Sequence, residues 1–169
     1  MTIESLRDLF EMELRYAYDC EQKLVKKGLP NMIKAASSPE LRTALEHHLQ
    51  ETRGQVARLE RVFSSIGVEK DTEDNDVFDE LAGATDDVIS DVKASALRDA
   101  ALIVCGNKVE HYEIAIYGSL VAFADQLGFR DATTLLQQTL DEEKAADVKL
   151  TQIAKININP GAASEQRAA

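Results

Sequence analysis

The sequence predicts an all-α fold, a four-helix bundle with one long crossover between helices two and three. Composition is the first indication, because the 169 residues include no Trp and only 5% aromatic side chains, and the abundance of Ala, Leu, Glu, Asp and Lys favours helices over strands. Four long segments show apolar residues at helical spacing. The connections between these segments are unequal in length, which indicates the crossover. A hydrophobic content of 44% over this length predicts one domain with its own core.

The first helix is expected from about Thr2 to Lys27, because apolar residues recur there with a helical period. Gly28 and Pro30, in the sequence "KKGLP", are expected to end it. A short helical turn over "NMIKAA" then leads to the second long helix. The apolar positions of the first helix are Leu6, Phe10, Leu14, Ala17 and Leu24.

The second long helix is expected to begin at "SSPEL", where Ser38 can cap the helix and Pro39 suits its first position. It should continue to "SSIG". The stripe that faces the core mixes apolar and polar side chains: Leu41, Leu45, His48, Thr52, Gln55, Leu59 and Val62.

The third and fourth long helices form the second half of the bundle. The third is predicted from near Ser95 to Leu127, and Asp131 is expected to cap the fourth, which runs to about Ile156. Residues 1–156 then form the bundle domain. The small and polar tail, residues 157–169, is predicted to be disordered.

Residues 67–94 separate the second and third helices. This segment is acidic and only weakly helical, around residues 77–92. Two short hairpin connections with one long link between them predict that the link travels the length of the bundle, so that helices two and three run parallel.

Carboxylates interrupt the inward stripe of every long helix. They are Glu21 in the first helix, Glu51 in the second beside His48, Glu110 and Glu113 in the third, and Glu143 and Asp147 in the fourth. An ionised carboxylate without a partner is costly to bury, and several together repel one another. The nearby basic side chains fall mostly on outward faces, so a metal is the simplest compensation. Residues three or four positions apart share a helix face, and a carboxylate-rich set with one histidine suits two divalent ions, Fe or Mn.

Helix phase leaves two alternatives open. Glu142 lies next to Glu143, and either could turn inward, although Glu143 is preferred. Glu13 is a second candidate beside Glu21 because the distances from the first hairpin match only loosely. Any one of these carboxylates alone is more simply a solvated surface group, and the metal hypothesis depends on their presence at similar heights in all four helices.

Four stretches of the sequence resemble the YciF/YciE family of bacterial stress-associated ferritin-like proteins. They are "YDCEQKL", "HLQET", "DAALIVCGNKVEHYEIAIYGSL" and "TLDEEKAADVKLT", and the likeness is closer to the YciF branch. The resemblance implies a rubrerythrin-like bundle, usually dimeric, with a dinuclear metal centre. It implies the ligands Glu21, Glu51, Glu110, Glu113 and Glu143, with His48 nearby. The Glu-x-x-His spacing of many di-iron proteins is absent, since Gly54 follows Glu51 and Ala146 follows Glu143 at that distance.

These observations lead us to expect a cytoplasmic homodimer with a di-iron or dimanganese carboxylate site, with Glu51 and Glu143 as bridges, that reacts with peroxide or oxygen during stress. The alternative is a non-enzymatic helical dimer that serves as a stress-response interaction protein. A net charge of −11 argues against nucleic acid as a partner. No apolar run reaches the roughly 20 residues of a membrane span.

Overall fold

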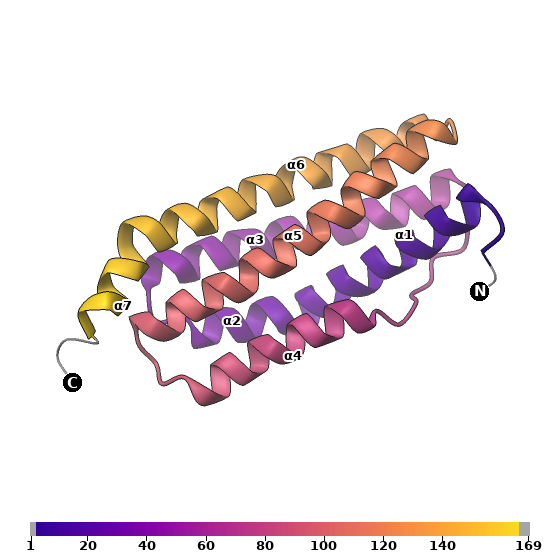
Figure 1. The fold of residues 1–169 in the computed structure, drawn as a ribbon. Helices are drawn as coiled ribbons and strands as arrows, with labels where there is room; N and C mark the ends of the chain where they lie inside the picture. Colours follow the sequence, from indigo (N-terminus) through magenta and orange to yellow (C-terminus); the bar gives the residue numbers. More distant parts are fainter. Residues whose placement is uncertain (1–2, 166–169) are drawn as a thin grey trace.

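The computed structural model describes residues 3–165, and all of its regular structure is helical (Figure 1). The elements in chain order are α1 (Leu6–Lys23), the π-helical turn η1 (Leu24–Gly28), α2 (Leu29–Ala35), α3 (Pro39–Ser65), α4 (Asp76–Asp91), α5 (Ala96–Gln126), α6 (Arg130–Ile153), the π-helical turn η2 (Ala154–Ile158) and α7 (Asn159–Glu165).

The long helices form four columns, which are α1–η1–α2, α3, α5 and α6–η2–α7, and these columns lie side by side (Figure 1). The column α1–η1–α2 is antiparallel to α3, and α6 is antiparallel to α5. The link between α3 and α5 runs back along the bundle and contains α4, so α3 and α5 point the same way. The predicted four-helix bundle with one crossover is therefore confirmed.

Side-chain caps and glycines set the ends of these helices. Ser38 accepts a hydrogen bond from the Leu41 amide at 3.3 Å, as predicted for the start of α3, and Ser95 caps α5 in the same way. Gly67 and Gly128 adopt positive φ angles of 72° and 76° after α3 and α5. Glycine adopts this left-handed conformation without a steric penalty, which lets the chain turn directly into the next segment.

The prediction that Gly28 and Pro30 end the first helix is wrong. The chain stays helical through the π-turn η1 and continues as α2 to Ala35. Proline lacks an amide donor, and its ring clashes with the carbonyl four residues earlier in a regular α-helix. The carbonyl four residues before Pro30 belongs to Lys26, which lies within the π-turn. Because a π-turn widens the backbone there, the helical column continues past the proline.

The end of the chain differs from its prediction for a related reason. The sequence predicts a disordered tail over 157–169, but η2 and α7 continue the column to Glu165, and residues 166–169 lie outside the described range. Another π-turn precedes another proline, Pro160. The Glu165 carboxylate then accepts hydrogen bonds from the amides of Ala96 and Leu97 at the start of α5. Asp131 is not the cap of α6, which begins one residue earlier at Arg130, with Phe129 in the cap position.

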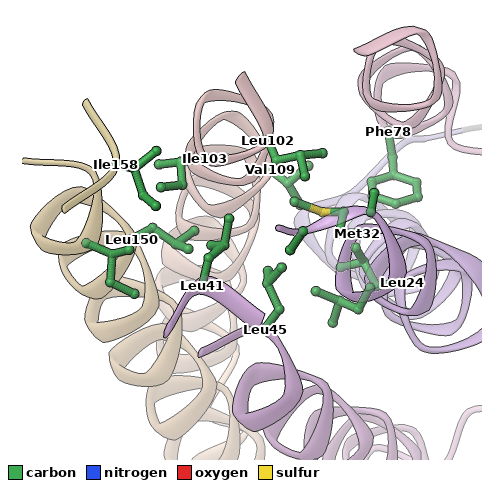
Figure 2. Close-up of a cluster of buried hydrophobic side chains, with 14 of the residues drawn as sticks. Leu24, Met32, Leu41, Leu45, Phe78, Leu102, Ile103, Val109, Leu150 and Ile158 are labelled. Atoms are coloured by element: carbon green, nitrogen blue, oxygen red, sulfur yellow. The ribbon is translucent and has the colours of Figure 1, made fainter. Parts of the chain in front are cut away.

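Two groups of buried apolar side chains fill the bundle. The first, called here the Met32 cluster, is drawn in Figure 2, where side chains of α3, α5 and α6 meet Met32 and Phe78. Its labelled members are Leu24, Met32, Leu41, Leu45, Phe78, Leu102, Ile103, Val109, Leu150 and Ile158. The second, called here the Phe10 cluster, includes Phe10, Leu14, Tyr18, Leu59, Phe63, Tyr117, Leu120 and Leu136.

The crossover helix α4 is fixed to one face of the bundle. Phe78 is buried in the Met32 cluster. Two ion pairs join α4 to the first column, Lys23–Asp79 at 2.6 Å and Lys27–Asp86 at 2.8 Å. Because these pairs are largely exposed and contribute little to stability, α4 is held mainly by its apolar side chains, among which Phe78 is buried.

Candidate metal centre

A polar layer crosses the bundle between the two apolar clusters. Each of the four long columns contributes to it, and its acidic and histidine members are almost fully buried: Glu21, His48, Glu110, Glu113 and Glu143. All lie on the inward stripes that the sequence predicts. Of the alternatives that helix phase left open, Glu21 and Glu143 are fully buried, whereas Glu13 and Glu142 are only half-buried.

Four members of this layer converge on one point. His48 from α3, Glu110 and Glu113 from α5, and Glu143 from α6 each offer one ligand atom, and these atoms all lie within 4.8 Å of one another. The His48 Nε2 atom is 3.4 Å from Glu110 Oε1 and 3.8 Å from Glu143 Oε2. We call these four residues the carboxylate–histidine cluster.

Glu21 lies beside this cluster on α1. Its side chain is completely buried, and the Tyr117 hydroxyl donates a hydrogen bond to its Oε1 atom. The preceding residue, Cys20, places its sulfur 3.7 Å from Glu113 Oε1. Glu21 is therefore held in a fixed position by Tyr117.

Glu143 is oriented by a chain of contacts from α3. The Gln55 amide donates to Glu143 Oε1 and also to Glu142 Oε2, the latter at 3.1 Å. Arg58 makes two hydrogen bonds to Glu142, at 3.0 and 2.8 Å. This arrangement fixes the amide of Gln55 and, through it, the carboxylate of Glu143.

The structure does not bring Glu51 and Asp147 into the cluster. Glu51 is about one third exposed and lies at its edge, 3.7 Å from His48 Nδ1 and 3.1 Å from His47 Nδ1. Asp147 accepts a hydrogen bond from the Asn107 side chain at 2.6 Å and lies 3.2 Å from His111 Nε2. Its carboxylate faces the outer side of the α5–α6 pair, because His111 is an exposed residue.

The electrostatics of the layer are those of crowded, desolvated acids. Burial raises the pKa values of Glu21 and Glu143 to about 7, and it raises those of Glu110 and Glu113 well above the usual range, with repulsion between neighbouring carboxylates adding to the effect. Burial alone would lower the pKa of His48, but the Glu110 carboxylate and the other acids around it raise the pKa to about 10.

The unsatisfied atoms of the layer test whether a metal fits. One oxygen of each buried carboxylate, Oε2 of Glu21, Glu110, Glu113 and Glu143, has no hydrogen-bond partner, and neither has Nδ1 of His48. Buried polar atoms are nearly always paired, so these converging unpaired oxygens form a group that could hold a metal ion. A donor set rich in carboxylate with one imidazole fits a first-row divalent metal.

Sequence reasoning missed Gln55, Arg58 and Tyr117 as residues that position the site. Gln55 lies on the predicted inward stripe, and its polar side chain in that stripe is a usable signal. Arg58 gives no such signal, because its role comes from Glu142 on another helix. The role of Tyr117 likewise depends on Glu21, which is far from it in the sequence.

The fold and the site together define a class of protein, a crossover four-helix bundle with a buried carboxylate–histidine cluster able to hold a metal ion. The sequence matches the family described as "Domain of unknown function (DUF892)" over residues 5–163, and the chain belongs to that family. It is 41% identical to protein YciF of Escherichia coli strain K12, over 94% of this chain and 96% of that protein.

Solved structures agree with this assignment. The crystal structure of the Escherichia coli stress protein YciF has a TM-score of 0.88 and 39% identity, with 93% of this chain and 99% of that chain covered. YcfI from Rhodopseudomonas palustris has a TM-score of 0.85 and 38% identity, with 88% and 94% covered. A protein from Xanthomonas campestris shares the fold at 20% identity, with a TM-score of 0.73 and with 96% and 99% covered. Within residues 3–165, none of the helices has the length and hydropathy of a membrane span.

Proposed function

We propose that this protein binds two Fe or Mn ions in the polar layer and reacts with peroxide or oxygen. The observation that carries the proposal is the carboxylate–histidine cluster, whose ligand atoms lie within 4.8 Å of one another while its buried carboxylate oxygens lack partners. Replacing buried ionic side chains by apolar ones of similar volume is often neutral or stabilising for the folded state. The buried carboxylates of this layer are therefore better explained by a function than by stability.

The proposed ligands are the four residues of the cluster together with Glu21, which supplies a further carboxylate for the second ion. Glu51 lies at the exposed edge of the cluster, so we propose it as an additional outer ligand and not as the expected bridge between the two ions. Asp147 takes no part, because Asn107 and His111 engage its carboxylate. Bound Fe or Mn would supply the electrons for reduction of the oxidant.

The other residues of the layer hold the ligands in place. Gln55 orients Glu143, and the Arg58–Glu142 pair holds Gln55. Tyr117 orients Glu21. Partners of this kind fix ligand geometry and typically change metal affinity about 10- to 100-fold when removed. A role in stress is supported by the relative in Escherichia coli, which is described as a stress protein.

Metal content of tag-free protein tests the proposal. We expect about two Fe or Mn per chain by mass spectrometry, as in two-metal sites generally, and loss of this metal in Glu110→Ala. Glu46→Ala is the matched control, because Glu46 is exposed on the outer side of α3. Equal metal content in all three proteins would contradict the assigned site.

Reaction with an oxidant is tested separately on the loaded protein. We expect Fe(II)-loaded protein to accelerate the decay of hydrogen peroxide, and Glu110→Ala to lose the acceleration. Protein that binds no metal, and whose stability does not change with Fe(II), Mn(II) or a chelator, would instead favour the non-enzymatic interaction protein, since a ligand that binds only the folded state must raise its stability. Light scattering of the same samples tests the homodimer that the family resemblance leads us to expect.

A further inference from the structure

A large cavity opens beside the carboxylate–histidine cluster, between α3 and α6. Its volume is about 660 Å³. His48 and Glu110 are both buried and form its inner end, and Glu51, His47 and Lys149 are more exposed and lie towards its mouth. The cavity therefore connects solvent with the proposed metal ligands.

Small side chains create this space. Ala44 on α3 and Ala145 and Ala146 on α6 line the cavity, together with Leu45 and Leu150. One helical turn further along the same pair of helices, Gln55 and Arg58 bridge α3 to Glu142 and Glu143. The two helices are thus joined at one end of the site and separated by small apolar residues at the other.

The size and the walls of the cavity indicate what it admits. A water molecule takes up about 30 Å³ in the liquid, so hydrogen peroxide or oxygen would fill only a small part of this volume. Sites for organic ligands are typically about 300–1,000 Å³, with mostly apolar walls and a few polar groups. The volume and the alanine and leucine walls fit an organic molecule.

The hydrogen-bonding groups at the inner end restrict the polar group of that molecule. His48 and Glu110 line the cavity there, and both are buried. An imidazole N–H can donate a hydrogen bond and a carboxylate oxygen can accept one, so this end suits a small group that carries both an O–H donor and an acceptor oxygen. An organic hydroperoxide is neutral and apolar apart from its terminal O–O–H group.

We propose that the cavity binds an apolar organic hydroperoxide and directs its O–O–H group to His48 and Glu110. This inference rests on the proposed reaction with peroxides and names the substrate class. Reduction breaks the O–O bond of ROOH and, with two protons from solvent, gives ROH and water. Two Fe(II) ions held by the proposed ligands would supply the two electrons and would become Fe(III).

Binding is tested first, without metal. The probe is 2-phenyl-2-propanol, the alcohol that corresponds to cumene hydroperoxide, added to metal-free protein and followed by ligand-observed NMR. We expect binding to the wild-type chain and at least tenfold weaker binding to Ala146→Leu, whose added side chain fills the cavity. Ala115→Leu is the control, because Ala115 is exposed on α5. Circular dichroism checks that each variant is folded.

Selectivity is tested next, in single turnovers of Fe(II)-loaded protein. We expect the second-order rate constant with cumene hydroperoxide to exceed that with hydrogen peroxide at least tenfold, with one alcohol formed per two Fe(II) oxidised. Ala146→Leu should reduce this rate ratio at least tenfold, and Ala115→Leu should leave it unchanged.

The outcomes separate this inference from the proposed function. Equal rates with both peroxides, or a rate ratio that Ala146→Leu does not change, would overturn the substrate class while leaving peroxide chemistry in place. Failure of both peroxides to react with loaded protein would overturn the proposed function and this inference with it, even if the alcohol binds. No binding of the alcohol to the wild-type chain would overturn the inference alone.

Discussion

The Phe10 cluster and the polar layer are adjacent slices of the same bundle, built by the same helices, and they differ in what they contribute. In the Phe10 cluster the buried groups are apolar and include a contact between the rings of Tyr18 and Phe63, with centroids 5.6 Å apart. In the polar layer, the residue of α1 that lies one helical turn after Tyr18 is Glu21, and its side chain is completely buried. The first slice removes apolar surface from water, and the second removes charges from water.

Stability and the proposed function therefore depend on different levels along the axis of the bundle. The Met32 and Phe10 clusters stabilise the folded chain whether or not a metal is bound. The polar layer opposes folding in the metal-free protein, because its carboxylates are desolvated and repel one another. A cation would reverse that effect, so the layer is expected to stabilise the fold only in the metal-bound state.

The largest expected effect concerns the apolar slice. Leu120→Ala should lower the free energy of unfolding by about 3–4 kcal/mol, because Leu120 is fully buried and the truncation leaves a cavity. Denaturant unfolding with and without metal measures the loss. The same loss is expected in both states, and metal content should be unchanged. A loss that appears only in one state would show that the two slices are coupled.

The pH dependence of the metal-free protein should give the next largest effect. The pKa values of Glu21 and Glu143 are about 7 in the folded state against an ordinary value of 4.5, so the folded chain holds protons that the unfolded chain releases. For His48 the folded pKa is about 10 against 6.5, which acts in the same direction. The stability of the metal-free protein should therefore fall as pH rises from 5 to 8.

Urea unfolding in the presence of a chelator at pH 5 and pH 8 measures this slope. Glu21→Gln should reduce it, since this variant has one buried acid fewer. Added Fe(II) or Mn(II) should reduce or reverse the fall, because metal ligands bind in their deprotonated form and affinity grows with pH. A metal-free protein more stable at pH 8 than at pH 5 would contradict the crowded-acid description of the layer.

A smaller effect, of opposite sign to that of Leu120→Ala, is expected for Glu113→Leu. Replacing this buried carboxylate by an apolar side chain of similar size should stabilise the metal-free protein by about 1–2 kcal/mol and should abolish metal binding. Chemical denaturation and metal analysis of the same preparation test both statements. Destabilisation of the metal-free variant would mean that Glu113 contributes to folding itself.

The smallest effect is expected for Thr52→Val in the polar layer. The Thr52 hydroxyl is buried but donates to the His48 carbonyl oxygen of its own helix at 2.8 Å, so it is already satisfied. We expect a change in unfolding free energy within about 1 kcal/mol and unchanged metal affinity. Metal titration followed by calorimetry distinguishes Thr52 from the ligands; a clear loss of affinity would place Thr52 in the site.

The sequence predicts the inward stripes well because burial repeats with the helical period. Every member of the predicted stripe of α3, including Thr52 and Gln55, is buried. The unequal connections likewise predict the crossover, since an antiparallel neighbour needs only a short loop. The inward carboxylates can be found in the same way, because they stand at positions where the helical repeat predicts an apolar residue.

Other features depend on atoms that are distant in the sequence. The continuation of the first column past Pro30 depends on a π-turn, which neither helix propensity nor apolar period reveals. The order of 157–165 depends on burial of Ile158 and on the contact of Glu165 with α5. Glu51 and Asp147 share a helix face with site residues, but a shared face does not specify which side chains converge.

The crossover gives the molecule two unequal sides. Its helix α4 covers the face formed by α5 and the first column, whereas the cavity lies on the other face, between α3 and α6. Reactants that use this cavity would therefore enter, and products would leave, on the α3–α6 side of the molecule. A partner protein or a second copy of the chain that bound over the α3–α6 side would block the mouth of the cavity. It would stop turnover without contacting any metal-binding residue, whereas a partner bound over α4 would leave the cavity open.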